Sequence, residues 1–244
     1  MTMKKPITPL VMLAILLTTL HMAPTAKAET TAQTVLADAV NNFIRPGYSA
    51  LHSATSQMEE TITPLCEAPS NGSFNAARDA FATLVTAWSE IEIIRFGPVI
   101  DGNRLERILF FPDRRGIGLK QVQAVLANKD ETATARESLT DKSVALQGLA
   151  TLEYLLYGTG AEALATGDTF RCAFAQAVAG RLETVAGQLE NAWTEPDGIA
   201  QRLAAPNAQN PDFRTNAEGL QALLGVFVNS SELLADTRLK PFVG

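Results

Sequence analysis

The amino-acid sequence predicts an all-α fold, a helical bundle of about seven helices joined by short connections. Apolar residues recur at intervals of three and four along most of the chain. No stretch alternates cleanly between apolar and polar residues, as a half-buried strand would. Of the 244 residues, 46% are hydrophobic and 19% are charged. This composition is sufficient to bury a core and excludes a wholly disordered chain.

Residues 1–28 have the pattern of a secretory signal peptide. Lys4 and Lys5 precede an apolar run at 7–20, and Ala26-Lys27-Ala28 forms a small-x-small cleavage site. The run is short for a membrane span, and no later stretch reaches its length. We therefore expect an exported protein with no transmembrane segment after cleavage.

Three amphipathic runs in the first half of the chain predict helices, at residues 30–43, 48–66 and 73–94. Pro46-Gly47 is expected to break the first run from the second, because both residues disfavour a helix interior. Ser73 can cap the third helix. The following segment, 98–118, is predicted to be a loop with one helical turn at 104–110.

Four further helices are predicted in the second half, at residues 119–128, 143–158, 170–193 and 215–238. Asp141 or Ser143 is expected to cap the second of these. A linker of small residues, 161–168, follows it. We place a boundary there, between a first helical bundle over 29–165 and a second, shortened bundle over 166–244.

The charge of the mature chain is acidic. Residues 1–28 contain three lysines and no acid, which leaves 17 bases against 26 acids. An acidic chain without a basic cluster argues against nucleic acid and against anionic lipid surfaces as partners.

A single histidine, His52, remains after residue 28. Sites that need two or more imidazoles are therefore excluded, among them three-histidine zinc centres. Glu59 and Glu60 follow His52 on roughly one helix face. A weak metal site is one interpretation of this trio, and a surface or helix-packing histidine is the favoured one.

The two cysteines, Cys66 and Cys172, are expected to form a disulfide in an exported protein. A disulfide that closes a loop of about a hundred residues stabilises the folded protein by roughly 4–5 kcal/mol in the chain-entropy model. Two free thiols are the alternative.

Glu153 is the single charged residue between Lys142 and Glu162. The helix predicted around it is apolar on every side, so we expect Glu153 to be buried. A buried carboxylate must be paired, hydrogen-bonded or bound to a cation. Glu153 is thus a candidate metal ligand or ligand-binding residue. The alternative is a structural ion pair with a buried arginine.

Trp88, Glu92 and Arg95 share one face of the predicted 73–94 helix and form a second group of candidate ligand-binding residues. Arg95 lies at the helix end and is a candidate partner for Glu153. The alternative is a core tryptophan beside a solvated ion pair.

The segment 101–118 carries many charges around an apolar centre, which is unusual for a plain connection. It could cover a pocket or hold an anion with its arginines. The candidate binding residues here are Asp113, Arg114 and Arg115. The alternative is a loop that packs its phenylalanines into the bundle.

The run Gly-Leu-Ala-Thr-Leu-Glu-Tyr-Leu-Leu-Tyr-Gly at 148–158 resembles the Gly-x-His-x-x-Glu signature of the imelysin family. Similar family stretches occur elsewhere in the chain, in the expected order. They are AWSEIEIIRFGP (87–98), FFPDRRGIGLKQVQ (110–123), the Leu-Cys pair before Pro69, and RCAFAQA (171–177). The resemblance covers about residues 32 to 240.

The resemblance implies an all-helical bacterial protein built from two four-helix-bundle-like halves. It also implies a periplasmic location in a Gram-negative bacterium, with association to the outer membrane left open. Family members are linked to iron uptake, and the family carries a metallopeptidase label. The signature His and Glu are its proposed metal-site residues. For this chain the implied partner is an iron-uptake, periplasmic or outer-membrane protein, and iron or zinc at Glu153 is the implied metal.

Two departures from the family pattern change the expected function. Ala150 stands where the signature has histidine, and alanine cannot ligate a metal. Family members also usually continue well past the last predicted helix. The second half is therefore expected to be incomplete, either naturally or by truncation, and to expose an apolar face.

These observations favour a non-catalytic periplasmic protein associated with iron uptake. It would bind a ligand, metal or partner in an inter-helix cleft near Glu153, Arg95 and the 101–118 segment. One alternative is a metallopeptidase of the imelysin type that uses carboxylate ligands. The other is a pseudo-enzyme that acts as a scaffold for a membrane or redox partner.

Overall fold

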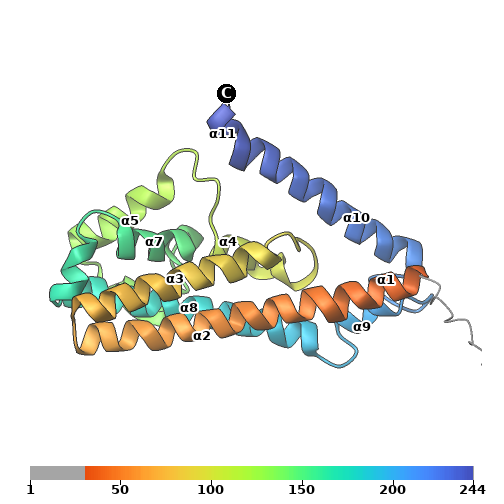
Figure 1. Cartoon of the computed structure of the whole chain (residues 1–244), viewed down its shortest axis with the longest axis horizontal. Coiled ribbons are helices and arrows are strands. Elements are labelled where there is room, and N and C mark those ends of the chain that lie inside the picture. The colour runs from red at the N-terminus through yellow and green to blue at the C-terminus, as the bar shows by residue number, and fades with distance from the viewer. Residues whose placement is uncertain (1–30, 244) are drawn as a thin grey trace, which may run out of the picture. The chain divides into compact units, whose positions relative to one another are not determined.

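Three long helices form the main body of the fold (Figure 1). They are α2 (Arg45–Glu67), α3 (Asn71–Ile91) and α8 (Thr169–Thr194), and α2 packs against both of the others. The structure is a computed structural model that describes residues 31–243, and within that range it contains helices and turns but no strand. The predicted all-α helical bundle is confirmed. The predicted signal peptide lies outside the described residues.

Shorter helices are added around these three. They are α1 (Ala32–Ala39), α4 (Arg104–Ile108), α5 (Ile117–Asn128), α6 (Arg136–Leu139), α7 (Leu149–Tyr157), α9 (Ile199–Ala204), α10 (Asn216–Leu233) and α11 (Lys240–Val243). Short 3-10 turns occupy Gly97–Val99, Asp101–Asn103, Glu131–Ala133, Val144–Leu146 and Ala161–Thr166. The chain from Thr31 onward forms one compact unit. The proposed division between residues 165 and 166 stays a prediction.

The predicted break at Pro46-Gly47 is wrong. A π-helical turn over Val40–Ile44 joins α1 directly to α2, and the Arg45 N–H bonds the Val40 carbonyl across it. Pro46 then falls in the first turn of α2, where the missing N–H of proline costs little. The helix therefore continues through the proline by widening one turn rather than by ending.

The segment before α7 also differs from the prediction. Ser143 does act as a cap, but for the 3-10 turn Val144–Leu146, and α7 begins only at Leu149. The predicted linker at 161–168 is largely the 3-10 turn Ala161–Thr166.

The disulfide between Cys66 and Cys172 is present and joins the end of α2 to the first turn of α8, with Cα atoms 5.6 Å apart. At the other end of the same helix pair, Tyr48 stacks on the fully buried Trp193, with ring centroids 5.9 Å apart. Both ends of the α2–α8 pair are therefore fixed.

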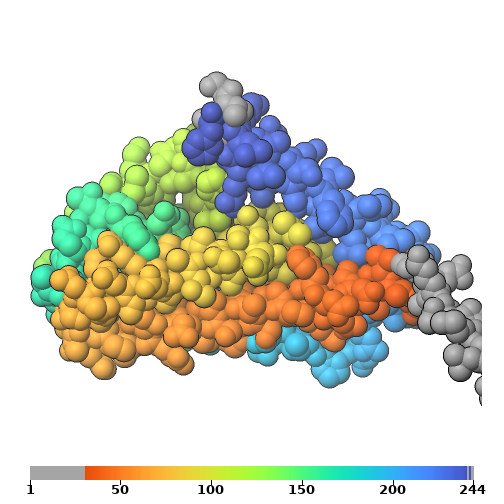
Figure 2. Space-filling model, viewed as in Figure 1, coloured from red at the N-terminus to blue at the C-terminus, as the bar shows by residue number. Residues whose placement is uncertain are grey.

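The long helix α10 packs against α1 and then extends away from the three long helices (Figures 1 and 2). A π-helical turn, Leu234–Leu239, continues α10 and returns to the 101–118 segment, where the Arg238 guanidinium lies 5.2 Å from the ring centre of Phe111. Several apolar side chains of α10 are exposed, among them Phe227 at 66% and Leu224 at 64%. No helix among residues 31–243 has the length and apolarity that a membrane span requires.

Candidate functional site

The helix α7, which carries Glu153, starts at a close backbone contact. Gly148 lies directly against the carbonyl oxygens of Arg107 and Ile108, and a side chain at this position would collide with them. Glycine here lets the 104–108 helix lie against the start of α7. The glycine of the family-like signature therefore has a packing role.

Two arginines hold the other end of α7. Arg171 is buried and donates hydrogen bonds to the Leu155 carbonyl at 3.2 Å and to the Thr159 carbonyl at 2.8 Å. Arg78 donates from Nε to the Leu156 carbonyl at 3.0 Å. These contacts satisfy carbonyls that a helix C-terminus leaves without partners. Sequence reasoning missed both arginines, because nothing in their local pattern shows which helix end they reach.

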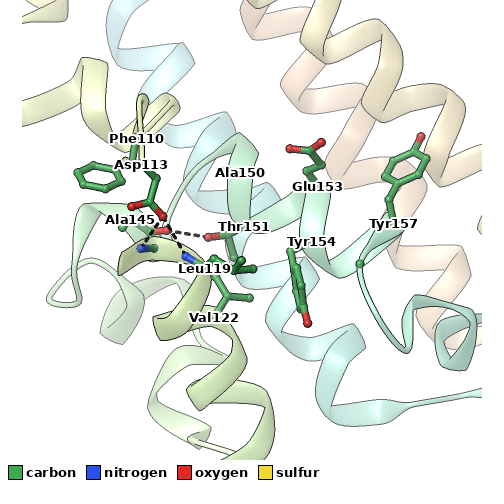
Figure 3. A pocket seen from close by; sticks show the side chains of 12 residues that line it. Phe110, Asp113, Leu119, Val122, Ala145, Ala150, Thr151, Glu153, Tyr154 and Tyr157 are labelled. Atoms are coloured by element: carbon green, nitrogen blue, oxygen red, sulfur yellow. Dashed lines mark hydrogen bonds between the residues drawn. The ribbon is translucent and has the colours of Figure 1, made fainter. Parts of the chain in front are cut away.

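A pocket of about 330 Å³ lies against one face of α7 (Figure 3). Side chains from α7, from α5 and from the segment before α5 surround it. Its lining residues are Phe110, Asp113, Gly118, Leu119, Val122, Ala145, Ala150, Thr151, Glu153, Tyr154, Tyr157 and Gly158. Of the sequence-predicted site residues, Glu153 and Asp113 are brought together here, and the others are not.

The prediction that Glu153 is buried is wrong. Its side chain is exposed at the pocket, and it has no hydrogen-bond or ion-pair partner among the residues that the structure describes (Figure 3). The predicted partner, Arg95, does not contact it. The buried arginine that we considered as an alternative partner does exist, as Arg171, but it binds the carbonyls at the end of α7. The burial of Glu153 was predicted wrongly because a helix that is apolar on every side can still have one face at a pocket rather than in the core.

Ala150 lies one turn before Glu153 on the same face of α7, and it is exposed in the same pocket. The tyrosines Tyr154 and Tyr157 continue this face. The Tyr157 hydroxyl donates to the Arg78 carbonyl at 3.0 Å, and Gln123 Nε2 approaches the Tyr154 hydroxyl at 3.4 Å. These tyrosines were not among the predicted site residues, although their spacing from Glu153 places them beside it.

Asp113 lines the pocket, but its carboxylate is already hydrogen-bonded to backbone N–H groups. Its carboxylate accepts hydrogen bonds from the N–H groups of Ile117 at 2.8 Å, Gly118 at 2.9 Å and Leu119 at 3.2 Å. These are orphan donors at the start of α5, so Asp113 acts as the cap of that helix. The next two predicted residues, Arg114 and Arg115, are exposed and do not line the pocket.

The Trp88, Glu92 and Arg95 group does not line the pocket either. Trp88 is buried in the core, and its Nε1 has no partner there. Both Glu92 carboxylate oxygens accept hydrogen bonds from Arg238 Nη2, at 2.7 and 2.8 Å. Arg95 donates from Nε to the Glu92 carbonyl at 3.2 Å. The alternative interpretation is confirmed for the core tryptophan, but Glu92 pairs with Arg238 of the turn Leu234–Leu239 rather than with Arg95.

The pocket's donor set does not fit a resident metal ion. Ala150 offers no ligand, and the Asp113 oxygens are taken by backbone N–H groups, so Glu153 is the one carboxylate that remains. No group of three His, Cys, Asp or Glu side chains in the described part of the chain has the arrangement of a metal site. A single monodentate or bidentate carboxylate is too few protein ligands for stable binding of iron or zinc.

His52 is a helix-packing residue between α2 and α8. Its Nδ1 lies 2.5 Å from Glu190 Oε2, and its Nε2 lies 3.2 Å from Glu183 Oε1. Glu59, which we had considered beside His52, instead pairs with Arg136. The favoured packing role of His52 agrees with this arrangement, although its two carboxylate partners come from α8 and not from its own helix.

The fold and the α7 face define the class of this protein. It is an all-helical protein whose Gly-x-x-x-x-Glu run starts α7 and lines a pocket. The family model of Imelysin, also named peptidase M75, matches residues 44–244, and the chain therefore belongs to the imelysin family.

A solved structure supports the same fold. An imelysin-like protein from Psychrobacter arcticum 273-4 superposes with a TM-score of 0.71 at 22% sequence identity, covering 86% of this chain and 63% of that protein. This chain thus spans less than two thirds of the solved relative's length. A search of curated proteins gave no match.

Proposed function

We propose that this imelysin-family chain is an exported, non-catalytic protein that acts in iron uptake by binding a ligand or partner on the open face of α7. The single observation that carries this proposal is the pair of positions on that face. Glu153 is an exposed carboxylate with no partner among the described residues, and Ala150 stands one turn earlier, where the family signature has histidine.

The α7 face suits recognition of a group that donates hydrogen bonds or carries positive charge. The Glu153 carboxylate would accept from that group. The rings of Tyr154 and Tyr157 offer apolar contact beside it. Because no other uncompensated charge lines the pocket, Glu153 would set the preferred charge of the ligand.

Catalysis by a metal-activated water is not supported by these residues. That chemistry needs several protein ligands and an open coordination position. The pocket contributes one available carboxylate and no imidazole. The periplasmic location and the iron-uptake partner rest on the family resemblance and form part of the proposal.

The test is metal binding and peptidase activity of the chain from residue 29, with Glu153→Gln and the control Glu60→Gln. Glu60 is an exposed glutamate on α2. We expect less than stoichiometric iron, zinc or copper by elemental analysis and by titration in all three proteins. We also expect no metal-dependent cleavage of an unfolded protein. Stoichiometric metal that is lost only in Glu153→Gln would overturn the proposal and favour the carboxylate-based metallopeptidase.

A second candidate function, a scaffold for a partner protein, is favoured by the apolar surface of α10. An apolar groove of about 300 Å³ lies between α1 and the turn Val40–Ile44, the residues just after α3, and α10, and its lining residues are all hydrophobic. Val228, which does not line the groove, is a further exposed apolar residue of α10, at 57%. Exposed apolar area of this kind marks interaction sites. Light scattering of the wild type and of Phe227→Ser tests it: concentration-dependent association that Phe227→Ser removes would support the scaffold.

A further inference from the structure

Three arginines meet where α4 packs against α8. Arg104 and Arg107 are three residues apart on α4 and share one of its faces. Arg181 lies on α8, which contacts α4. Every ion pair found within residues 31–243 involves other side chains. In an acidic chain, three neighbouring arginines without a carboxylate partner require an explanation.

A buried glutamine fixes two of these arginines. Gln147 is fully buried, and its Oε1 accepts from Arg107 Nη1 at 2.5 Å and from Arg181 Nε at 3.3 Å. The other side of the amide, Nε2, donates to the Lys142 carbonyl at 2.7 Å and to the Thr140 carbonyl at 3.4 Å. Since Nε2 faces two carbonyl oxygens, Oε1 must face the arginines. The two guanidinium groups are therefore held together over a neutral acceptor.

Neutral acceptors also hold the third arginine. Arg104 donates from Nε to Gln188 Oε1 at 3.2 Å and from Nη1 to the Pro98 carbonyl at 2.9 Å. Gln188 lies two helical turns after Arg181 on α8, so both point from the same side of that helix. The arrangement brings Arg104 to the same face as the other two.

Several N–H groups of the cluster remain available to a ligand. Nη2 of Arg104, Nη2 of Arg107 and both Nη atoms of Arg181 have no acceptor within the described range. None of these atoms is among the fully enclosed polar atoms that lack a partner, so each keeps some exposure to solvent.

The electrostatics of the cluster are unfavourable without an anion. Burial lowers the pKa of Arg181, and the positive charges of Arg107 and Arg104 lower it further. Like charges in a partly buried site repel one another more strongly than in water. A bound anion would remove this repulsion and supply the missing acceptors.

We propose that Arg104, Arg107 and Arg181 form a binding site for a multiply charged oxyanion of the phosphate class. The free Nη1 and Nη2 of Arg181 present a pair of N–H donors that matches two oxygens of such an anion, and Arg104 and Arg107 each add Nη2. The cluster carries three positive charges, which a divalent phosphate compensates better than a single carboxylate. None of the three arginines lines the α7 pocket, so this site is separate from the one discussed above.

The test measures the midpoint temperature of thermal unfolding at increasing concentrations of inorganic phosphate, with ionic strength and pH held constant. Three variants each change the net charge by one unit in the same direction: Arg181→Gln, Gln188→Glu and the control Arg214→Gln. Gln188 and Arg214 are both exposed, so these two substitutions leave the core intact. The Gln188→Glu variant keeps every arginine and places a competing carboxylate beside Arg104.

We expect a saturable rise in the midpoint for the wild type and for Arg214→Gln. In Arg181→Gln and Gln188→Glu the apparent affinity for phosphate should fall by about tenfold or more. A rise that does not saturate, or one that is equal in all four proteins, would overturn the proposal. Repetition with glycerol 3-phosphate separates two supporting results: binding of both compounds indicates a phosphoryl group on a larger molecule, and binding of phosphate alone indicates the free anion.

Discussion

Arg171 of α8 closes the end of α7 by donating a hydrogen bond to the Leu155 carbonyl at 3.2 Å. A second hydrogen bond, to the Thr159 carbonyl, extends the same contact past the helix end. A buried arginine that reaches carbonyls rather than a carboxylate links the α8 helix to the helix that carries Glu153. The stability of the α7 face therefore depends on a residue outside the pocket.

We expect Arg171→Met to lower the free energy of unfolding by about 2–4 kcal/mol, because it leaves buried carbonyl oxygens without donors. Urea unfolding followed by circular dichroism gives this value. The exposed Arg214→Met provides the comparison and should change stability by less than about 0.5 kcal/mol. Equal stability of the two variants would show that the Arg171 hydrogen bonds contribute little.

The disulfide between Cys66 and Cys172 closes a loop of 106 residues. We expect the double variant Cys66→Ala/Cys172→Ala to lose roughly 2–5 kcal/mol of stability, because the unfolded chain gains conformational freedom. The thermal midpoint of the variant, compared with that of the wild type under non-reducing conditions, measures the loss. A reducing agent should lower the midpoint of the wild type and leave that of the variant unchanged.

The contact of His52 with Glu190 and Glu183 predicts a pH-dependent stability. The hydrogen bond with Glu190 raises the pKa of His52 above its ordinary 6.5, and Glu183 adds to the rise against the opposing effect of burial. A folded pKa above the unfolded one stabilises the protein fully below about pH 6.5, and the contribution is lost as the pH rises through the folded pKa.

The stabilising contribution of the His52–Glu190 contact is also lost at low pH. Hydrogen bonding by Ser49, and then by His52, lowers the pKa of Glu190. Its contribution is present above its ordinary value of 4.5 and is lost as the pH falls through the lowered pKa. The interaction should therefore contribute most between about pH 4.5 and 6.5.

For these partly exposed side chains we expect His52→Gln to cost about 0.5–1 kcal/mol at pH 5.5 and less at pH 9. Denaturant unfolding of both proteins at the two pH values tests this. An identical difference at pH 5.5 and pH 9 would contradict the imidazolium–carboxylate interaction.

The position of Ala150 predicts a gain of metal binding on substitution. Ala150 and Glu153 are one helical turn apart on the exposed face of α7, and a histidine at 150 meets open space in the pocket. We expect Ala150→His to bind zinc measurably more tightly than the wild type, because an imidazole joins the carboxylate. Titration calorimetry measures the gain, and the double variant Ala150→His/Glu153→Gln should lose it. No gain in Ala150→His would mean that the α7 pocket lacks the further ligands that a zinc site needs.

Local patterns were enough to predict most of the helices and the all-α class. The long helices α2, α3 and α8 bury apolar residues at regular helical spacing, and this periodicity is independent of what each helix contacts. The disulfide was also predictable, because a chain with two cysteines has one possible intramolecular pairing. Family membership followed from motif order along the sequence.

The exposure of individual side chains and the partners of charged residues could not be predicted from local patterns. Glu153 is surrounded in sequence by apolar residues, yet it lies at a pocket because α5 and the preceding segment leave one face of α7 uncovered. Pro46 was expected to end a helix, but a widened turn stabilised by packing accommodated it.

The sequence by itself determined the helical class, the cysteine pair and the alanine at the signature position, because each depends on residue type and local spacing. The tertiary structure alone decided which charges meet. Arg238 pairs with Glu92, 146 positions away in the sequence, and Arg181 and Arg107 both donate hydrogen bonds to Gln147 Oε1. Such contacts depend on how the helices pack, since long side chains find whichever partner the neighbouring helix presents.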